Sequence, residues 1–532
     1  MKELSRLRAQ VIKKNAQVDI LEQTVRELRQ SLEDSESKIQ SLVEKLHLAH
    51  QKRYGSSSES MPPLDLEFNE AENNADAPDD SDDDISGEEN SDTEADTNND
   101  IPPNAKRKSR KPLPKDLPRK HVVVDVAEDE KSCACCQSAL SKMGKETNEK
   151  LVYIPAELYV EVTERPKYVC RQCDAQGEKT IVLMAPPPPS ILPKGIATPS
   201  LIAQIIVHKY HYALPLYRQE SLFRQYGIEL SRKTMSQWML YSAEQFEFLM
   251  VLLKKTLLAQ DILFADETTL TVLDDERKKS YIWLYGCGGD RGGNATSPSI
   301  VLFDYQEGSR GHHCPQMYLS GYTGYLHVDG YAAYMKTEAK LVGCWAHARR
   351  KFVEAEKSQP EGKKGKGAKI NWALNWFQKL YLIEREIKGK PQEERHAIRS
   401  SKTKPLLDKF KAWLDKSVIH VLPKSKLGVA INYCLNQWAK LERFTDDSRL
   451  NVDNNRAERS VRPFTVGRNN WLFSKSHNGA RASATLYSLI ETAKANDCEP
   501  YAYLEYLLRE IPKLKAGDDP SHLLPWNMPR TL

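Results

Sequence analysis

The sequence predicts a multidomain protein of mixed α/β class, and three observations support this prediction. At 532 residues the chain is too long for a single hydrophobic core. Short runs rich in Val, Leu, Tyr and Thr, typical of strands, lie within residues 261–335, and helical periodicity dominates the segments on either side. A heptad repeat and paired CxxC motifs add two smaller domains. No apolar stretch approaches the ~20 residues that cross a bilayer, so no membrane partner is expected.

Residues 1–54 predict a coiled coil that joins two copies of the chain. Apolar residues recur every seven positions. β-Branched residues at heptad position a (the first position) with Leu at position d (the second) favour a parallel two-stranded arrangement. Lys14 and Ser35 interrupt the pattern. A helix packed on its own globular domain is the alternative, and the polar residues on every other face count against it. The first positions are Leu4, Val11, Val18, Val25, Leu32, Ile39 and Leu46, and the second include Leu7, Leu21, Leu28 and Leu42.

Residues 55–104 predict a disordered acidic linker. Sixteen Asp or Glu and no Lys or Arg lie between Pro63 and Asp100, so the net charge of +4 leaves the rest of the chain near +20. Such a balance favours a polyanionic partner such as DNA, although a scattered, solvated basic surface gives the same sum. The linker ends in a basic run that could contact phosphates or be shielded by the acidic stretch. Its candidate DNA contacts are Arg107, Lys108, Arg110 and Lys111.

Residues 105–186 contain a candidate zinc site. Five of the ten cysteines fall in this segment, which favours a metal over a disulfide framework and fits a reducing cytoplasm. Two CxxC pairs are separated by a β-rich stretch, and four thiolates at this spacing suit a closed tetrahedral Zn²⁺ site of structural type. Unrelated buried cysteines are the alternative, and Cys135 could replace either neighbour. The four candidate ligands are Cys133, Cys136, Cys170 and Cys173.

Residues 190–260 predict several short helices in an order similar to a helix-turn-helix. The pattern breaks near Pro215 and Gly227, and Ser231 is a candidate N-cap for the helix that follows. A helical connector without DNA contact would give the same pattern. In the helix-turn-helix interpretation the residues facing DNA are Arg232, Lys233 and Gln237, and those facing the core are Trp238 and Leu240.

Three carboxylates from separate segments are candidate ligands of divalent cations. Asp266 and Asp329 lie on strand-like runs, and Glu458 lies near the start of a predicted helix. Mg²⁺ prefers oxygen ligands, and two ions ~4 Å apart can activate the attacking oxygen and stabilise the leaving one in phosphodiester cleavage. Strands that end in acidic residues and precede helices favour an RNase H-like α/β core, built from residues 261–335 and 451–497.

Each acid also has a purely structural explanation. Neighbouring side chains on a strand point to opposite faces, so Asp266 and Glu267 cannot share one metal site, and periodicity does not choose between them. Asp266 could simply end a strand, and Asp329 before a glycine is also a turn sequence. Asn455 and Glu458 have the spacing of a capping box. All these explanations remain open at this point.

A helical insertion is predicted between the second and third acids, over residues 336–450. The segment begins with CWAHARRKF and continues with helix-like runs that contain four tryptophans. His347 could reach the scissile region, whereas the plainer explanation is a helix with its apolar residues buried and its basic residues solvated. The candidate phosphate contacts in this segment are Arg349, Arg350 and Lys351.

Taken together, these segments resemble the transposases of the insertion-sequence-66 family over essentially the whole chain. The matching stretches, in order, are RYGSSSE, the paired CxxC region with YIPA, KYHYALPLYRQE, ADET, VDGYAAY, GCWAHARRKF, DNNRAER with GRNNWLF, and LLPW in the C-terminal tail, 498–532. Gln137 stands where a glycine is usual, and Tyr54 stands where Phe is typical. Neither departure touches the three acids.

The resemblance implies a DDE-type transposase of a bacterial insertion sequence, with Asp266, Asp329 and Glu458 as catalytic acids. It implies two Mg²⁺ or Mn²⁺ ions at these acids and one structural Zn²⁺. The implied partners are DNA (element ends and target), further copies of the chain, and accessory proteins from the same element, in a bacterial cytoplasm at the nucleoid. Arg459 and Arg462 flank Glu458 and are candidate phosphate contacts. Two other functions remain open, a non-catalytic zinc-stabilised dimeric regulator and a nuclease that cuts without joining.

Overall fold

The computed structural model describes residues 158–169, 182–193, 195–277, 279–288, 298–359 and 369–529, with 23–32 and several residues from 34 to 46. The predictions for the acidic linker, the basic run and the zinc site lie outside these residues. Among the described residues, no helix has the length and apolar character that a membrane span requires. The residues outside the description include Arg107, Lys108, Arg110, Lys111, Cys133, Cys135, Cys136, Cys170 and Cys173.

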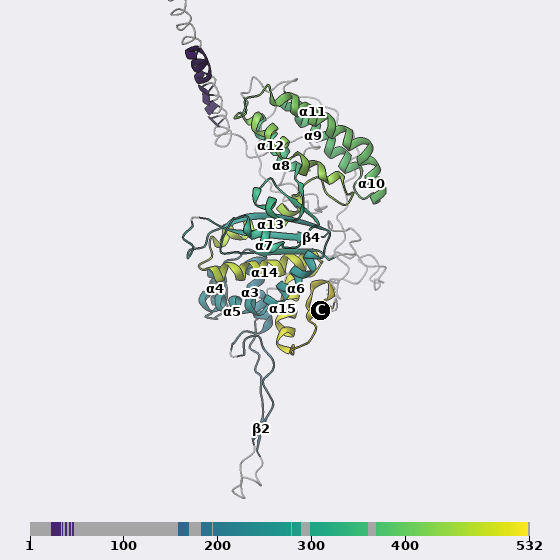
Figure 1. Ribbon diagram of the computed structural model, residues 1–532. Coiled ribbons are helices and arrows are strands. Elements are labelled where there is room, and N and C mark those ends of the chain that lie inside the picture. The colour runs from purple at the N-terminus through teal and green to yellow at the C-terminus, as the bar shows by residue number, and fades with distance from the viewer. Residues whose placement is uncertain are drawn as a thin grey trace, which may run out of the picture. The chain divides into compact units, whose positions relative to one another are not determined.

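A five-stranded mixed sheet carries the first two acids (Figure 1). Its order is β5-β4-β3-β6-β7. Strand β4 is antiparallel to both β3 and β5, β6 is parallel to β3, and β7 is parallel to β6. Four of these strands coincide with the four predicted runs, and β7 was not predicted. The strands are β3 (Ile262–Leu270), β4 (Ser280–Cys287), β5 (Ile300–Asp304), β6 (Tyr325–Val328) and β7 (Lys340–Gly343).

The edge strand β5 is covered by helix α14 (His477–Ala495). The Ser488 hydroxyl accepts a hydrogen bond from the N–H of Phe303 at 2.7 Å. One turn further along, the Thr492 hydroxyl accepts from the N–H of Val301 at 3.1 Å and donates to the same residue's carbonyl at 2.9 Å. Four helical residues rise about 6 Å and two strand residues about 6.6 Å, so the two repeats match. The helix therefore pairs edge groups that a sixth strand would otherwise pair.

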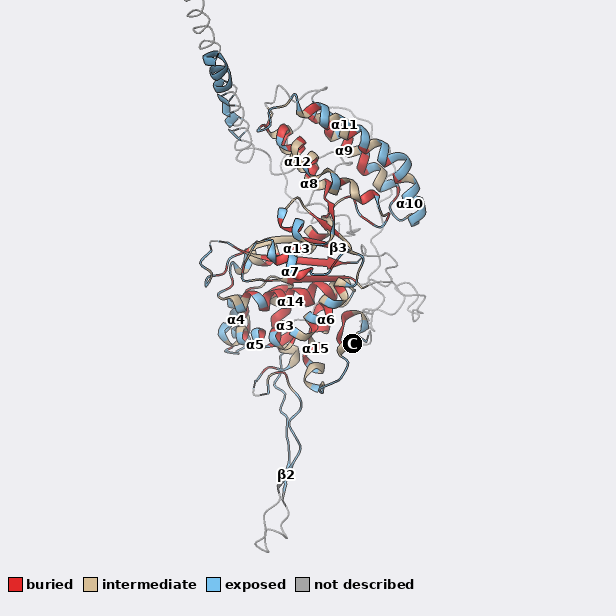
Figure 2. Cartoon of the chain, viewed as in Figure 1, coloured by how far each residue is buried: buried red, intermediate tan, exposed pale blue. Residues whose placement is uncertain are grey.

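The helices of 190–260 share one hydrophobic core with the sheet and with the helices at the C-terminal end (Figure 2). Ser231 accepts from the N–H of Thr234 at 3.2 Å, which confirms the predicted N-cap. Trp238 is buried as predicted, but the prediction for Leu240 was wrong, since it is 37% exposed. The helices are α3 (Pro199–Tyr210), α4 (Leu216–Gln225), α5 (Arg232–Gln245), α6 (Glu247–Leu258), α13 (Asn455–Trp471) and α15 (Pro500–Glu510).

The described part of 336–450 includes five α-helices, and the buried residues of four of them form a separate aromatic cluster. Trp376 stacks on Phe410 with ring centroids 3.8 Å apart, and the Trp345 ring lies against both Trp376 and Phe410. Arg399 is buried and pairs with Glu384 at 2.6 Å. The elements are α8 (Trp345–Lys357), α9 (Lys369–Glu386), α10 (Gln392–Ile398), the π-helical η5 (Arg399–Thr403), α11 (Lys404–Val418) and α12 (Lys426–Glu442).

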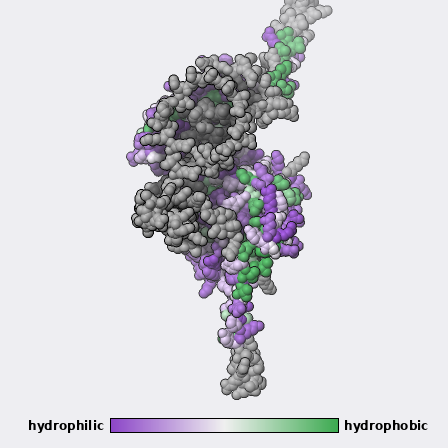
Figure 3. Space-filling model, turned by 180° about the vertical axis from the view of Figure 1, so that it is seen from behind, coloured by the Kyte–Doolittle hydropathy of each residue, from purple (hydrophilic) through white to green (hydrophobic). Residues whose placement is uncertain are grey.

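The remaining described elements are short or peripheral. Residues 23–32 are helical, and Val25, Leu28 and Leu32 of the heptad repeat are 46%, 64% and 61% exposed. Figure 3 shows this segment with hydrophobic and hydrophilic surface side by side. The short elements are β1 (Lys167–Val169), β2 (Val182–Met184), α7 (His313–Tyr318), η3 (Ala332–Lys336), η6 (Arg443–Thr445), η7 (Ile511–Lys513), η8 (Pro520–Leu523) and η9 (Pro525–Asn527).

Candidate active site

Asp266 lies in the middle of β3, opposite Leu284 of β4. Its Oδ1 accepts a hydrogen bond from the N–H of Glu267 at 2.8 Å. Burial raises the pKa of Asp266 well above its usual value, and the charges of Glu267, Asp329 and Glu458 raise it further. The three candidate acids are therefore close enough for each negative charge to disfavour the others.

Asp329 directly follows β6, which runs parallel to β3. Phe264 pairs with His327, so two more residues along the same register bring Asp329 level with Asp266. Oδ1 of Asp329 accepts from the N–H of Tyr331 at 2.8 Å, so the turn expected from the sequence is also present. The turn occupies one carboxylate oxygen and fixes the side chain at the end of the strand.

Glu458 lies in the first turns of α13, and the capping-box explanation for it is wrong. The helix begins at Asn455 with Asn454 as N-cap residue, so Glu458 is the fourth helical residue rather than the third. The side chain of Asn454 does not cap the helix; its Nδ2 donates to the carbonyl of Ala265 at 2.9 Å. This bond ties the start of α13 to the residue immediately before Asp266.

The carboxylate of Glu458 faces helix α8. Its Oε1 accepts from Nη2 of Arg350 at 3.3 Å and lies 3.5 Å from Nδ1 of His347. Its Oε2 is buried and has no hydrogen-bond partner among the described residues. Burial raises the pKa of Glu458, Arg350 opposes this rise, and Asp453 and Asp329 add to it. Burial lowers the pKa of His347, so the neutral imidazole is favoured beside Glu458.

Glu267 occupies the opposite face of β3 and already has partners. Nη2 of Arg310 donates to its Oε1 at 2.7 Å, and the hydroxyl of Tyr334 donates to its Oε2 at 3.1 Å. The guanidinium of Arg310 also stacks on the ring of Tyr331, 4.0 Å from its centroid. The neighbouring carboxyl that remains available is therefore Asp266, a choice that sequence periodicity did not make.

The donor set suits a hard divalent cation, because it consists of carboxylate oxygens and includes an unpaired oxygen on Glu458. Within the described ranges, no group of three or more His, Cys, Asp or Glu side chains is arranged to hold a metal ion as it stands. The residues therefore fit a divalent cation in the kind of donor that they provide.

Those predicted DNA-contacting residues that the structure describes lie on three helices. Arg232 and Lys233 are exposed at the start of α5, together with Gln237. On α8, Arg350 contacts one of the three acids, and Arg349 and Lys351 are half-buried. On α13, Arg459 is exposed and Arg462 is half-buried. The sequence analysis missed Asn454, for which the DNN run was a local signal, and Arg310, which lies outside the motifs named above.

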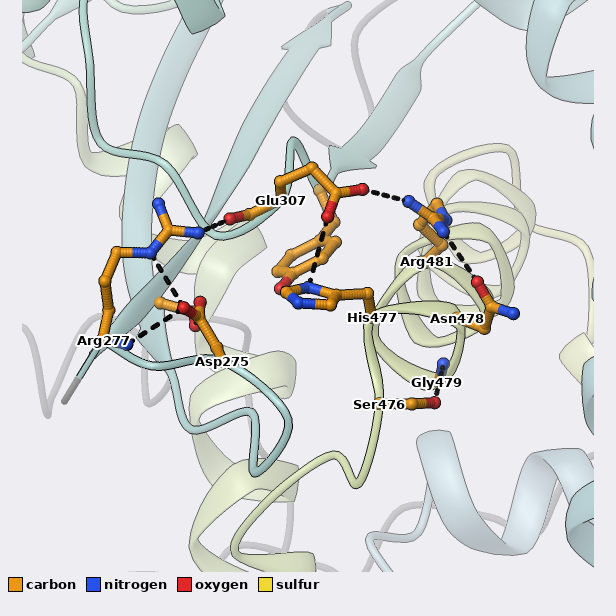
Figure 4. Close-up of polar contacts among 10 residues, drawn as sticks. Asp275, Arg277, Glu307, Ser476, His477, Asn478, Gly479 and Arg481 are labelled. Carbon is orange, nitrogen blue, oxygen red and sulfur yellow. Dashed lines mark hydrogen bonds and ion pairs between the residues drawn. The ribbon is translucent and has the colours of Figure 1, made fainter.

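A second polar cluster at the start of α14 differs from the three acids in having its charges paired (Figure 4). Glu307 lies between Arg481 and His477, and its Oε2 is 3.5 Å from Nδ1 of His477. Asp275 pairs with Arg277 at 2.9 Å, and these contacts together with the Ser280 hydroxyl bond lower the pKa of Asp275 to about 2 against the effect of burial. Because each carboxylate has its own cation, this cluster joins loops rather than offering a reactive acid.

Four family models match the chain. The model "Transposase IS66 family" matches residues 194–482, and "zinc-finger binding domain of transposase IS66" matches 130–174. "IS66 C-terminal element" matches 488–526, and "Transposase C of IS166 homeodomain" matches 41–122. The first match contains all three acids, and the second contains all four candidate zinc ligands.

Three similar proteins come from Sinorhizobium fredii (strain NBRC 101917 / NGR234). "Uncharacterized protein y4jD" is 36% identical over 432 residues, which cover 78% of this chain and 81% of the relative. "Uncharacterized protein y4hP" is 34% identical over 80% of this chain and 78% of its own length. "Uncharacterized protein y4qI" is 34% identical over 76% and 75%, respectively. No solved structure matches the chain.

Proposed function

This chain belongs to the IS66 family of transposases, and from that premise we propose that it is a DDE-type enzyme. It binds the ends of an insertion sequence, cuts the DNA there, and joins the freed ends to a target. The observation that carries the proposal is the approach of three carboxylates from β3, the end of β6 and α13. Burial and Glu267 raise the pKa of Asp266, and the charges of Asp329 and Glu458 add to the rise. No covalent bond between protein and DNA is needed for this chemistry.

The sheet order supports an RNase H-like core for the enzyme. Strands β5, β4 and β3 are antiparallel to one another in turn, and β6 and β7 run parallel to β3. The first strand of this sheet along the chain, β3, therefore lies beside the fourth, β6. The first and second acids lie on these two adjacent strands, where their register makes them neighbours. The helical insertion then falls between the fifth strand and the helix that bears the third acid.

We assign two Mg²⁺ or Mn²⁺ ions to the three acids, with Asp266 shared between them. Asp329 would complete the binding of one ion and Glu458 of the other. When bound, such ions favour the deprotonated form of the attacking oxygen and stabilise the charge on the leaving oxygen. The carboxylates must be ionised for this role, and the raised pKa values of Asp266 and Glu458 mean that cation binding is coupled to proton release at these two residues.

The neighbouring residues hold the third acid in place. Arg350 orients Oε1 of Glu458 and leaves Oε2 available. Asn454 fixes the helix start to β3, so the distance between Asp266 and Glu458 is set by a side chain bonded to the backbone. Burial lowers the pKa of His347, so its neutral ring can donate a hydrogen bond from one nitrogen and accept one at the other beside Glu458 without adding positive charge.

The partner regions complete the proposal. The exposed apolar side chains of the N-terminal helix favour a coiled-coil dimer that brings two DNA ends together. Cys133, Cys136, Cys170 and Cys173 would hold one structural Zn²⁺, as the matched zinc-finger model supports. The exposed Arg232, Lys233 and Arg459 are proposed phosphate contacts, with the basic run before the zinc segment.

The test is cleavage and joining of duplexes that carry the ends of the element encoding this chain. Wild-type protein in Mg²⁺ should release 3′-hydroxyl ends and join them to target DNA, and Asp329→Asn should do neither. Cutting without joining would favour the nuclease alternative. Sequence-specific binding with no cutting, also after the accessory proteins of the element are added, would favour the regulator and overturn the proposal.

A further inference from the structure

Lys440 on α12 is a buried cation for which the proposed chemistry has no role. Its Nζ is buried and has no hydrogen-bond partner among the described residues. Burial lowers the pKa of Lys440, the carboxylate of Asp329 raises it, and Arg443 lowers it. The ammonium group therefore lies within electrostatic range of the second catalytic acid without bonding to it.

Close backbone packing places this part of α12 against the ends of β6 and β7. A Cβ on Gly343, the last residue of β7, would lie 3.1 Å from the backbone nitrogen of Leu441 and 3.2 Å from the carbonyl carbon of Lys440. The indole of Trp345 donates to the carbonyl of Leu441 at 2.7 Å. The backbone of Lys440 and Leu441 is therefore held against β7 and the start of α8.

A second residue of α12 lies at the same end of the sheet. A Cβ on Gly330, the residue after Asp329, would lie 2.7 Å from the ring of Tyr433. Burial raises the pKa of the Tyr433 hydroxyl, and the charge of Asp329 contributes to the rise. Two turns of one helix thus border the second acid, one with a phenol and the other with an ammonium group.

An unpaired ammonium group buried in a protein is unfavourable, because it has lost water and gained no anion in return. The nearby Asp329 does not supply that anion, since no bond joins the two and Oδ1 of Asp329 is engaged with Tyr331. A phosphate that enters beside Asp329 would bring an anionic oxygen into this space. Lysine binds phosphate as a compact point charge in other phosphate sites.

We propose that Lys440 is a phosphate-binding residue of the active site, which pairs with a nonbridging oxygen of the DNA backbone beside Asp329. The proposal rests on the proposed function only in taking DNA as the anion. It gives the helical insertion a direct part in substrate binding, through a residue about one hundred positions away in sequence from the acid it serves. It also predicts that Lys440 lowers the stability of the free protein and raises that of the DNA complex.

The experiment compares wild type, Lys440→Met, Lys440→Arg and Lys416→Met, without divalent cations so that binding is separated from cutting. Lys416 is an exposed lysine of the same insertion and controls for the loss of one charge. We expect Lys440→Met to bind end-containing duplex roughly ten- to one hundredfold more weakly, as for a lost charged hydrogen bond. Lys440→Arg should recover part of the affinity, and Lys416→Met should change it less than about threefold. The free Lys440→Met protein should melt at a higher temperature than wild type.

A set of duplexes with a single neutral methylphosphonate at successive positions around the cleavage site then locates the contact. At one position the neutral group should weaken binding by wild type and have no further effect on Lys440→Met. Equal binding by Lys440→Met and wild type, or additive losses at every position, would overturn the proposal. Coupling at one position with no cutting by wild type in Mg²⁺ would leave Lys440 as a phosphate contact while the proposed function failed. Normal cutting by wild type without coupling at any position would support the proposed function and overturn the role of Lys440 as a phosphate contact.

Discussion

The sheet with its packed helices and the helical insertion contribute opposite chemistry to one site. Asp266, Asp329 and Glu458 all come from β3, β6 and α13, whereas the nitrogen groups that face them come from α8 and α12. The acids are held by strand register and by Asn454, which bonds to backbone. The groups opposite them depend on side-chain packing in an aromatic cluster.

This difference teaches that the insertion is part of the site rather than an appendage. Three carboxylates lie near one another; burial raises the pKa of Asp266 most, and the charges of Glu267, Asp329 and Glu458 raise it further. Arg350 bonds directly to Glu458, and it belongs to the insertion. Replacing an acid of the sheet region should therefore abolish DNA cleavage. Replacing a nitrogen group of the insertion should mainly weaken DNA binding or the positioning of an acid.

The largest expected effect is the loss of cleavage when Glu458 is replaced, compared with the smaller loss when its neighbour Arg350 is replaced. Glu458→Gln keeps the shape of the side chain but removes the charge, so DNA cleavage in Mg²⁺ should fall by about a thousandfold or more. Arg350→Met should lower cleavage by only about tenfold, because it loosens Glu458 without removing it. Single-turnover cleavage measures both. Equal losses in the two variants would mean that the two regions do not divide the chemistry in this way.

The next effect concerns the core of the insertion. Trp376 is buried and its indole donates to the carbonyl of Leu406 at 2.9 Å, so Trp376→Ala should lower the free energy of unfolding by about 3–5 kcal/mol. Trp372 on the same helix is 43% exposed, and Trp372→Ala should cost clearly less. Compared with wild type, amide hydrogen exchange in Trp376→Ala should increase more in α9 and α11 than in β3 and β4. Uniform loss of protection would make the two regions one cooperative unit.

A pH-dependent effect belongs to the sheet. His327 on β6 is buried, neither ring nitrogen has a partner among the described residues, and burial lowers its pKa to about 4, with Arg399 adding to the shift. The unfolded chain binds a proton near pH 6.5 and the folded chain only near pH 4, so stability is full above pH 6.5 and falls as pH drops toward 4. The loss amounts to about 3 kcal/mol.

Replacing His327 with Leu should remove this part of the acid destabilisation, as measured by urea unfolding at pH 7, 6 and 5. His396 is exposed, so His396→Gln should leave the pH profile of wild type unchanged. An unaltered slope in His327→Leu would show that the ring is not kept neutral by the fold.

The smallest effect tests the cover of the sheet edge. Thr492→Val leaves the N–H and carbonyl of Val301 without the hydroxyl that pairs them, which should cost about 1–3 kcal/mol. Thr492→Ser keeps the hydroxyl and should cost less. Thermal unfolding compares the two variants, and equal midpoints would mean that water or another group takes over this pairing.

Much of the sheet could be predicted from the sequence, because four strands have clear runs of β-branched and aromatic residues. The fifth strand, Lys340–Gly343, was not predicted and lies within the segment predicted as a helical insertion. Ser231 was found as an N-cap because its signal is local. Leu240 was predicted in the core together with Trp238, but residues two positions apart on a helix do not share a face, and Leu240 is exposed.

The site was harder to predict wherever it depends on packing between distant segments. The choice between Asp266 and Glu267 is decided by Arg310 and Tyr334, which cover one face of β3. Asn455 and Glu458 match a capping box in sequence, but the bond from Asn454 to β3 moves the helix start by one residue. Lys440 has no motif at all, since its place follows from the contact between α12 and β7.

The central claim is that Asp266, Asp329 and Glu458 form the reactive group, and the neighbouring carboxyls on β3 test it most directly. Mg²⁺-dependent cleavage of end-containing DNA should be measured for wild type, Asp266→Asn and Glu267→Gln under the same conditions. We expect Asp266→Asn to lose cleavage while it still binds DNA, and Glu267→Gln to retain most of it. Retained cleavage in Asp266→Asn, or complete loss in Glu267→Gln alone, would contradict the claim.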